Sequence, residues 1–548
     1  MRPFYYLLAI LLTTNAFAQT FQNTPPNRQI ANRGTVVPIT ATIAYQGYDE
    51  TQAYFGQGEY EIFADLQAGT LDKPVIVLDG FDPGDSRDIA GLYNSLSFGG
   101  DNIADIVRDE GFDVVILNAP QYTTDGKFID GGSDYIQRNA MVLVETIQQI
   151  NDQKVGNEEL VILGPSMGGL IARYALAYME ENNIEHETRL YISFDSPHLG
   201  ANIPISLQYL INYLAVQTGD PLAQALIDDV LGSPAAKEML IDHLEAHLLA
   251  GSEFEQDPTK LLPEGAPDFR DAFQGELNAL GFPSNVRNVA MINGAGDGTG
   301  TGSPGLEVIN TTLDLDVVTS ADVALYFTPE ASQSLTVVSF DTFLVGVPVA
   351  SFSADSESRA VSDGVDSAPG GTSNISNALS GGGGNQVIID FVNALQQDEY
   401  CFIPTISALA IDTEENWFAS PDLNDSPFVA TYIPLQNESH VQVTQESADF
   451  ALDEIRNGAL AIDEVALDMA YILERNPVDA QIVLKRNRTV SGTDVEVSIT
   501  SLSGQVLLEQ SFETALDELR IAHSLASGLY FITIQNGQAS NTIKFVVK

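Results

Sequence analysis

The sequence predicts an α/β protein: a doubly wound, mostly parallel sheet with a helical cap and an inserted β element, followed by a small C-terminal β-sandwich. Short apolar runs, which are typical of buried parallel strands, alternate with amphipathic helical runs between about 74 and 194. After about residue 476 the pattern changes to short alternating runs separated by Ser-Gly and Asn-Gly turns, which predicts the sandwich.

The strands of the predicted sheet follow one another at intervals that leave room for helices between them. They are expected at 36–44, 74–78, 112–117, 161–163, 190–194 and 288–293, with helices at 135–150 and 168–178. Strand–helix alternation of this kind favours parallel pairing of the strands. We expect one large domain over residues 35–475 and a separate unit over 476–548.

Two insertions interrupt this alternation. Residues 201–285 are rich in Leu and Ala, are broken by Gly-Pro-containing turns, and predict a helical cap. Residues 305–385 begin with alternating strands over 311–349 and continue with a Ser/Gly-rich stretch, 351–384, that we interpret as a mobile loop.

Composition bounds the cellular context. The chain has 548 residues and a formal net charge of −51, which argues against nucleic acid and anionic membrane surfaces as partners. Residues 1–18 have a basic start, an apolar stretch and an Ala-Phe-Ala end, as in a signal peptide, and 19–34 predict a flexible leader. No later stretch predicts a transmembrane helix, and the single cysteine, Cys401, excludes an internal disulfide.

The most informative stretch is the strand, turn and helix around Ser166. It reads Gly164-Pro165-Ser166-Met167-Gly168, a Gly-x-Ser-x-Gly motif between an apolar run and an amphipathic helix. In that motif small flanking residues allow a sharp turn that exposes the serine hydroxyl above the sheet. Ser166 is therefore the candidate nucleophile.

This stretch resembles the nucleophile elbow of α/β-hydrolase lipases and esterases. The resemblance implies an oxyanion hole made by the backbone N–H of Met167 and by that of Phe81, in the loop after the strand at 74–78. Asp79 departs from the pattern, because it stands where lipases often carry histidine. The Pro197-His198-Leu199-Gly200 turn is also lipase-like, and His198 is expected to make turn hydrogen bonds there.

The resemblance further implies an acid and a histidine later in the chain. His440 lies in a loop between the last strand and a closing helix, which is the histidine position. Asp297, in a Gly-Asp-Gly loop after the strand at 288–293, is the first candidate acid, and Asp412 and Asp195 are the alternatives. The order nucleophile, acid, histidine is that of the family.

No cofactor or metal is expected for this chemistry. His243 and His247 have a helical spacing, but they lack the Glu of a His-Glu-x-x-His metal site, so we interpret them as structural.

The last 70 or so residues resemble the C-terminal sorting domain of proteins exported by the type IX secretion system. The features are Asn476-Pro477, a central Ser503-Gly504-Gln505-Val506, Ser527-Gly528-Leu529-Tyr530-Phe531, and a basic end at Lys548. The resemblance implies export across a Gram-negative outer membrane, with that machinery as the partner.

The sequence therefore predicts a secreted or cell-surface serine hydrolase that acts on carboxylic esters or lipids, through a Ser-His-Asp triad and an acyl-enzyme. Two alternatives stay open: another serine hydrolase on the same fold, such as a peptidase, thioesterase or inositol-deacylase-like enzyme, and a surface-binding protein that has lost the reaction.

Overall fold

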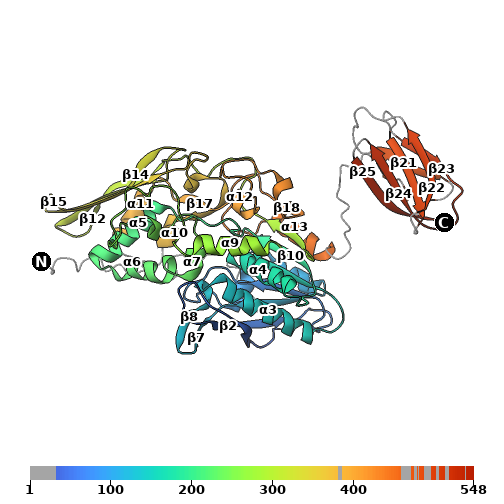
Figure 1. The fold of residues 1–548 in the computed structure, drawn as a ribbon, viewed down its shortest axis with the longest axis horizontal. Helices are drawn as coiled ribbons and strands as arrows, with labels where there is room; N and C mark the ends of the chain where they lie inside the picture. The colour runs from blue at the N-terminus through green and yellow to red at the C-terminus, as the bar shows by residue number, and fades with distance from the viewer. Residues whose placement is uncertain are drawn as a thin grey trace. The chain divides into compact units, whose positions relative to one another are not determined.

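The structure is a computed structural model that describes residues 33–379, 386–457 and parts of 471–548. The predicted signal peptide, and the leader up to residue 32, lie outside the described residues. The chain forms two compact units, residues 1–459 and 460–548 (Figure 1).

The larger unit is built on one sheet whose strand order is β1-β2-β6-β3-β9-β10-β11-β18. The pairs from β6 to β18 are parallel, and β2 is antiparallel to both of its neighbours. The strands are β1 (Val37–Tyr45), β2 (Tyr54–Phe63), β3 (Pro74–Leu78), β6 (Asp113–Asn118), β9 (Leu160–Pro165), β10 (Thr188–Phe194), β11 (Arg287–Met291) and β18 (Ala430–Tyr432).

Helices cover both faces of this sheet, because successive residues of a buried strand point to opposite sides. Ile76 and Leu78 of β3 share one core with α3 (Ile136–Gln153) and α4 (Met167–Glu181), whereas Val75 and Val77 belong to a second core. That second core is closed by α1 (Ile89–Ser95), α2 (Ile103–Asp109) and α13 (Gln445–Asn457). The predicted doubly wound α/β architecture is confirmed.

The stretch between β10 and β11 contains several helices joined by loops. They are α5 (Ile205–Tyr213), α6 (Pro221–Ala225), α7 (Pro234–Met239), α8 (Leu244–His247) and α9 (Arg270–Leu280), with π-helical segments η2 (Leu214–Thr218) and η3 (Leu226–Leu231). We call this group the cap helices.

A four-stranded antiparallel sheet follows β11, with the order β12-β13-β14-β15. Its strands are β12 (Glu307–Asp314), β13 (Thr319–Tyr326), β14 (Ser334–Leu344) and β15 (Val347–Glu357). We call it the inserted sheet; α5 and α11 (Gln386–Ala394) lie beside it (Figure 1).

The interpretation of residues 351–384 as a mobile loop is wrong for much of that stretch. Residues 351–357 continue β15, where Ser351 pairs with Asp341, and β16 (Gly370–Asn374) pairs with β17 (Glu399–Pro404). Strand pairing and burial supply the hydrogen bonds and apolar contacts that the Ser/Gly-rich composition did not suggest. Residues 380–385, with the run of glycines, lie outside the described residues.

The smaller unit contains two antiparallel sheets, β19-β20-β23 and β22-β21-β24-β25. Inward residues of both sheets, such as Leu484 and Ile521 on one and Val497 and Ile532 on the other, share one core, which makes the unit a β-sandwich. The strands are β19 (Tyr471–Leu473), β20 (Gln481–Arg486), β21 (Val495–Ser501), β22 (Val506–Phe512), β23 (Glu518–Ala522), β24 (Gly528–Asn536) and β25 (Ala539–Val547).

No helix in the described part of the chain combines the length and the apolar character needed to span a membrane.

Candidate active site

Ser166 occupies a strained turn between β9 and α4. Its backbone has φ 54° and ψ −128°, a region that residues with a side chain rarely adopt, and its N–H donates to Phe194 O at 2.8 Å. Helix α4 starts at Met167, the next residue, so its free N–H groups face the position of the hydroxyl. This is the strand–turn–helix geometry of a nucleophile elbow.

The glycines of the motif are required by close packing. A Cβ on Gly164 would lie 2.6 Å from Gly168 O, and a Cβ on Gly168 would lie 2.6 Å from Asp79 O. Any larger residue at either position would push apart the turn or the loop after β3.

Ser166 is the first member of a hydrogen-bonded chain of side chains. Ser166 Oγ lies 2.9 Å from His440 Nε2, and His440 Nδ1 lies 2.6 Å from Asp195 Oδ2. The three residues come from the ends of different elements: Ser166 follows β9, Asp195 follows β10, and His440 precedes α13. Because parallel strands end at the same sheet edge, the fold brings them together there.

The structure does not place Asp297, the first choice of acid, against His440, whose Nδ1 lies by another carboxylate. The Asp297 side chain is exposed and accepts a hydrogen bond from Thr299 N at 2.9 Å, and Asp412 is exposed as well. The carboxylate that lies against His440 Nδ1 belongs to the alternative, Asp195, which is fully buried. Asp297 lies several residues past the end of β11, whereas Asp195 directly follows β10.

Asn293 ties Asp195 to the histidine loop, and the sequence interpretation had missed it. Its N–H donates to Asp195 Oδ1 at 3.0 Å, and its side-chain amide donates to Glu438 Oε2 at 2.9 Å and to Gln442 O at 3.0 Å. One residue therefore fixes the acid and the loop that carries His440. The signal available in the sequence was an amide residue at the end of a predicted strand.

Strand β16 closes the other side of the site. His440 N donates to Thr372 O at 2.9 Å, and a Cβ on Gly371 would lie only 1.9 Å from Asp195 Oδ2. The ring of Phe402, on β17, meets the His440 ring edge-on with centroids 4.9 Å apart. The acid is thus shielded from water by backbone and the imidazole by an aromatic ring, which strengthens their electrostatic interaction.

The loop after β3 lies against the start of α4, as the contact between Asp79 O and Gly168 requires. No hydrogen bond of the described residues uses the N–H of Phe81, and that of Met167 is one of the orphan donors at the start of a helix. The loop that carries Phe81 therefore packs against the helix start that carries Met167.

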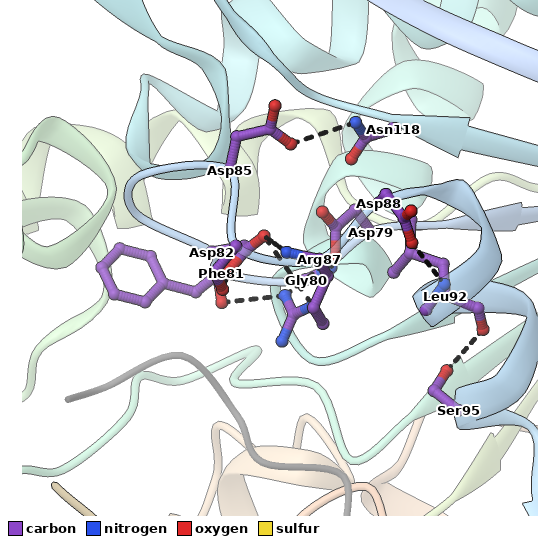
Figure 2. A network of polar contacts seen from close by, with 12 residues as sticks. Asp79, Gly80, Phe81, Asp82, Asp85, Arg87, Asp88, Leu92, Ser95 and Asn118 are labelled. Carbon is purple, nitrogen blue, oxygen red and sulfur yellow. Dashed lines mark hydrogen bonds and ion pairs between the residues drawn. The ribbon is translucent and has the colours of Figure 1, made fainter. Parts of the chain in front are cut away.

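A buried arginine holds this loop, as Figure 2 shows. Arg87 Nη2 donates to Asp79 Oδ1 at 2.8 Å and to Phe81 O at 3.0 Å, and Arg87 N donates to Asp82 Oδ2 at 2.8 Å. Asp82 N in turn donates to Gly132 O at 2.9 Å. The peptide between Phe81 and Asp82 is thus fixed from both ends, while the Phe81 ring points away from Arg87 (Figure 2).

The burial of this loop shifts the pKa of Asp79. Burial raises the pKa of its carboxyl from an ordinary 3.8 to about 6, although the nearby Arg87 cation and the Gly80 N–H act in the opposite direction. Burial disfavours the charged carboxylate, and Arg87 only partly offsets it. The ion pair between them is therefore sensitive to pH near neutrality.

The other histidines of the larger unit have structural partners. His198 Nε2 lies 2.9 Å from Ser193 Oγ, and burial lowers its pKa well below the ordinary value. His243 caps α8 and reaches Leu231 O, and His247 pairs with Asp242. Cys401 is a buried free thiol whose pKa is raised by burial. Within the described residues no group of His, Cys, Asp and Glu side chains could hold a metal ion.

Two family models match parts of the chain. Residues 130–223, which contain Ser166, match a family described as "Putative serine esterase (DUF676)", and residues 476–548 match the "Secretion system C-terminal sorting domain". The elbow, the parallel sheet and helices on both of its faces decide the fold of the larger unit. It is an α/β-hydrolase fold. Residues 476–548 are a secretion sorting domain.

Solved structures that resemble the chain include lipases and esterases. The lipase BlEst2 of Bacillus licheniformis is 13% identical, with 43% of this chain and 72% of that chain covered and a TM-score of 0.23. The esterase of Pyrobaculum calidifontis is 12% identical, covering 50% and 66%, with a TM-score of 0.23. Est1E of Butyrivibrio proteoclasticus is 12% identical, covering 43% and 73%, with a TM-score of 0.22. The search of the curated proteins found no match.

The family match and the elbow support a serine hydrolase. The sorting domain indicates export, to the cell surface or beyond.

Proposed function

We propose that this chain is a secreted serine ester hydrolase that acts on carboxylic esters through an acyl-enzyme. The observation that carries the proposal is the chain from Ser166 through His440 to the fully buried Asp195, with separations of 2.9 and 2.6 Å. Such a chain turns a weakly nucleophilic hydroxyl into an attacking group, since the imidazole takes its proton.

The reaction proceeds in two steps. His440 Nε2 accepts the Ser166 proton as Oγ attacks the ester carbonyl, and Asp195 holds Nδ1–H and stabilises the imidazolium. The imidazolium then protonates the leaving alcohol. Water, deprotonated by His440, attacks the acyl-enzyme and releases the acid.

The developing oxyanion is bound by the N–H groups of Phe81 and Met167. Donors fixed in advance in a site closed to water stabilise the tetrahedral intermediate, and the loss of one such donor costs about 10²–10³ in rate. Arg87 contributes by holding the loop that presents Phe81. The reaction uses side chains and backbone alone and requires no metal or cofactor.

The proposal includes export through the type IX secretion machinery, with residues 1–18 removed as a signal peptide and the sorting domain as the partner segment. The match of residues 476–548 to the sorting-domain model supports this part. A chain without residues 476–548 should stay in the periplasm of the producing cell, and its release into the medium would contradict the proposal.

The test of the reaction is hydrolysis of p-nitrophenyl esters from acetate to palmitate by the mature protein, by Ser166→Ala and by Asp297→Asn. We expect turnover that disappears with Ser166→Ala and persists with Asp297→Asn. Turnover of thioester or peptide substrates without ester hydrolysis would move the protein to another class of serine hydrolase. Folded protein with no turnover on any of these would indicate a binding role.

A further inference from the structure

Five valines gather at one end of the inserted sheet, and each is more than half exposed: Val317, Val318, Val345, Val347 and Val349. They belong to the turn between β12 and β13 and to the hairpin of β14 and β15. Val345 N donates to Val318 O at 2.7 Å, so the two turns lie side by side. We call this group the valine tip. Single exposed apolar residues are common on protein surfaces, but a contiguous group of them indicates an interaction site.

The hairpin that carries three of these valines is uncharged. Residues 342–354 contain no Asp, Glu, Lys, Arg or His, in a chain whose formal net charge is −51. Along β15, Phe352 and Ala354 are buried, and successive residues of a strand alternate between its faces. Val347 and Val349 therefore point to the opposite face, away from the core. The hairpin thus presents an apolar surface to solvent on an otherwise acidic protein.

Val345 occupies a strained turn. Leu344 pairs with Val347, so Val345 and Gly346 form a two-residue hairpin loop, and both have positive φ, 50° and 73°. This is a type I′ turn, whose first position favours Asn, Asp or Gly. A β-branched side chain rarely adopts positive φ, because its branches crowd the backbone. Valine at this position therefore lowers the stability of the fold, and a local conflict of this kind is typical of residues that serve a function.

Backbone groups of the valine tip have hydrogen-bond partners within it. Asp316 is the only charged residue of the turn at 315–319, and its Oδ1 accepts from Val318 N at 2.7 Å and from Thr319 N at 2.9 Å. Val345 N is paired with Val318 O, as described above. Polar backbone groups that leave water lose free energy unless they are paired. These groups can therefore enter a medium that contains little water.

The size and charge of the valine tip favour a lipid surface over a protein as its partner. A stable protein interface buries about 800 Å² on each side. Five valines offer less than this, since each is smaller than an aromatic side chain, which buries about 150–250 Å². A lipid surface binds exposed apolar side chains in proportion to the area that they bury. The net charge of −51 repels anionic lipids, so the lipid has to be uncharged overall.

From these observations we propose that the valine tip docks the mature protein onto lipid surfaces that carry no net charge. The docking is peripheral, because only the two turns at the end of the inserted sheet enter the lipid. It does not depend on the reaction proposed for Ser166, so protein without that hydroxyl docks in the same way.

The first experiment measures co-sedimentation of the mature protein with lipid vesicles. Phosphatidylcholine vesicles carry no net charge, and phosphatidylglycerol vesicles are anionic. We expect the wild type and Ser166→Ala to bind phosphatidylcholine equally, and to bind phosphatidylglycerol less tightly at low ionic strength. No binding to phosphatidylcholine would overturn the proposal. Tighter binding to phosphatidylglycerol would also overturn it, because the contact would then be electrostatic and made by another surface.

The variant Val345→Asn separates docking from stability. It creates the Asn-Gly pair that a type I′ turn favours, so the midpoint of urea unfolding should rise. It also removes two methyl groups, each worth about fourfold in affinity when buried, so binding to phosphatidylcholine should weaken about tenfold. A more stable protein that binds less tightly is the result that the proposal predicts. Val317→Ser, on the other turn, should weaken binding similarly and serves if Val345→Asn does not fold.

The matched control is Val155→Asn. Val155 is an exposed valine of the same unit, in the loop after α3, and lies outside the valine tip. This variant should bind phosphatidylcholine like the wild type. Equal binding by Val345→Asn and Val155→Asn would overturn the proposal.

A final experiment tests a second copy of the chain as the partner. Sedimentation velocity without lipid, over a range of protein concentrations, should give the same result for the wild type and Val345→Asn. A dimer that forms in the wild type and is lost in Val345→Asn would assign the valine tip to a second copy and overturn the proposal. If the protein binds phosphatidylcholine but hydrolyses no ester, the proposed function fails and the docking surface stands.

Discussion

Replacement of Arg87 by methionine tests whether the buried ion pair holds the oxyanion loop. Arg87 is 8% exposed and Asp79 is 5% exposed, and the guanidinium bonds both the Asp79 carboxylate and Phe81 O. Methionine keeps much of the apolar stem but leaves the carboxylate buried without its cation. Breaking a buried pair from one side costs about 3–5 kcal/mol.

The cost should depend on pH in a stated direction. In the wild type the pKa of Asp79 is about 6 in the folded chain against an ordinary 3.8. Between these values the folded chain binds more protons than the unfolded chain, so this group lowers the free energy of unfolding as pH rises through that window. Without Arg87 the pKa of Asp79 rises further. The free energy of unfolding then continues to fall above pH 6, by about 1.4 kcal/mol for each additional pKa unit.

The assay is urea unfolding of the wild type and Arg87→Met at pH 5 and pH 7.5. Trp417 is the only tryptophan of the chain and lies in the larger unit, so its fluorescence reports on that unit alone. We expect the difference in unfolding free energy between the two proteins to be about 1 kcal/mol larger at pH 7.5 than at pH 5. The turnover number of Arg87→Met should also fall, by up to about 10²–10³-fold, because the Phe81 N–H is misplaced.

The matched control is Arg456→Met. Arg456 pairs with Glu110 at 2.6 Å, but both side chains are more than a third exposed, so the change should cost about 0–1 kcal/mol at either pH. If Arg87→Met costs no more than Arg456→Met, or if its cost does not change with pH, the account of the loop is wrong.

The remaining predictions concern the acid, the packing around it and the second unit. Asp195→Asn should lower the turnover number about 10⁴-fold with the fold retained, because His440 loses its orienting carboxylate. Asp297→Asn, at an exposed position, should leave the turnover number unchanged. A large loss in Asp297→Asn with none in Asp195→Asn would restore Asp297 as the acid. Gly371→Ala should abolish most activity, since its Cβ would lie 1.9 Å from Asp195 Oδ2; wild-type kinetics would show that β16 can move away. Deletion of residues 476–548 should leave ester hydrolysis intact, as the two units have separate cores, and a folded but inactive truncation would contradict this.

Local patterns were sufficient to predict the sheet and the elbow. Buried parallel strands such as 74–78 are continuous apolar runs. The turn at Ser166 needs glycine on both sides, because a Cβ at either position would collide with neighbouring backbone. The position of His440, in a polar loop before an amphipathic helix, could be predicted because the chain has only six histidines and the others fit that position less well.

The acid could not be chosen from the sequence, because its selection depends on distances between loops. Asp195 and Asp297 both follow predicted strands, and only the fold shows that Asn293 N and His440 meet at Asp195. The role of Gly371 was hidden for the same reason: it approaches Asp195 from a segment whose composition suggested a loop.

The most direct test of the account is labelling with a fluorophosphonate, followed by mass spectrometry of the peptides from wild type and His440→Ala. The account predicts one adduct, on Ser166, in the wild type, and labelling at least about a hundredfold slower in His440→Ala, because the imidazole no longer removes the hydroxyl proton. An adduct on another residue, or equal rates in the two proteins, would contradict the assignment of Ser166 as a nucleophile activated by His440.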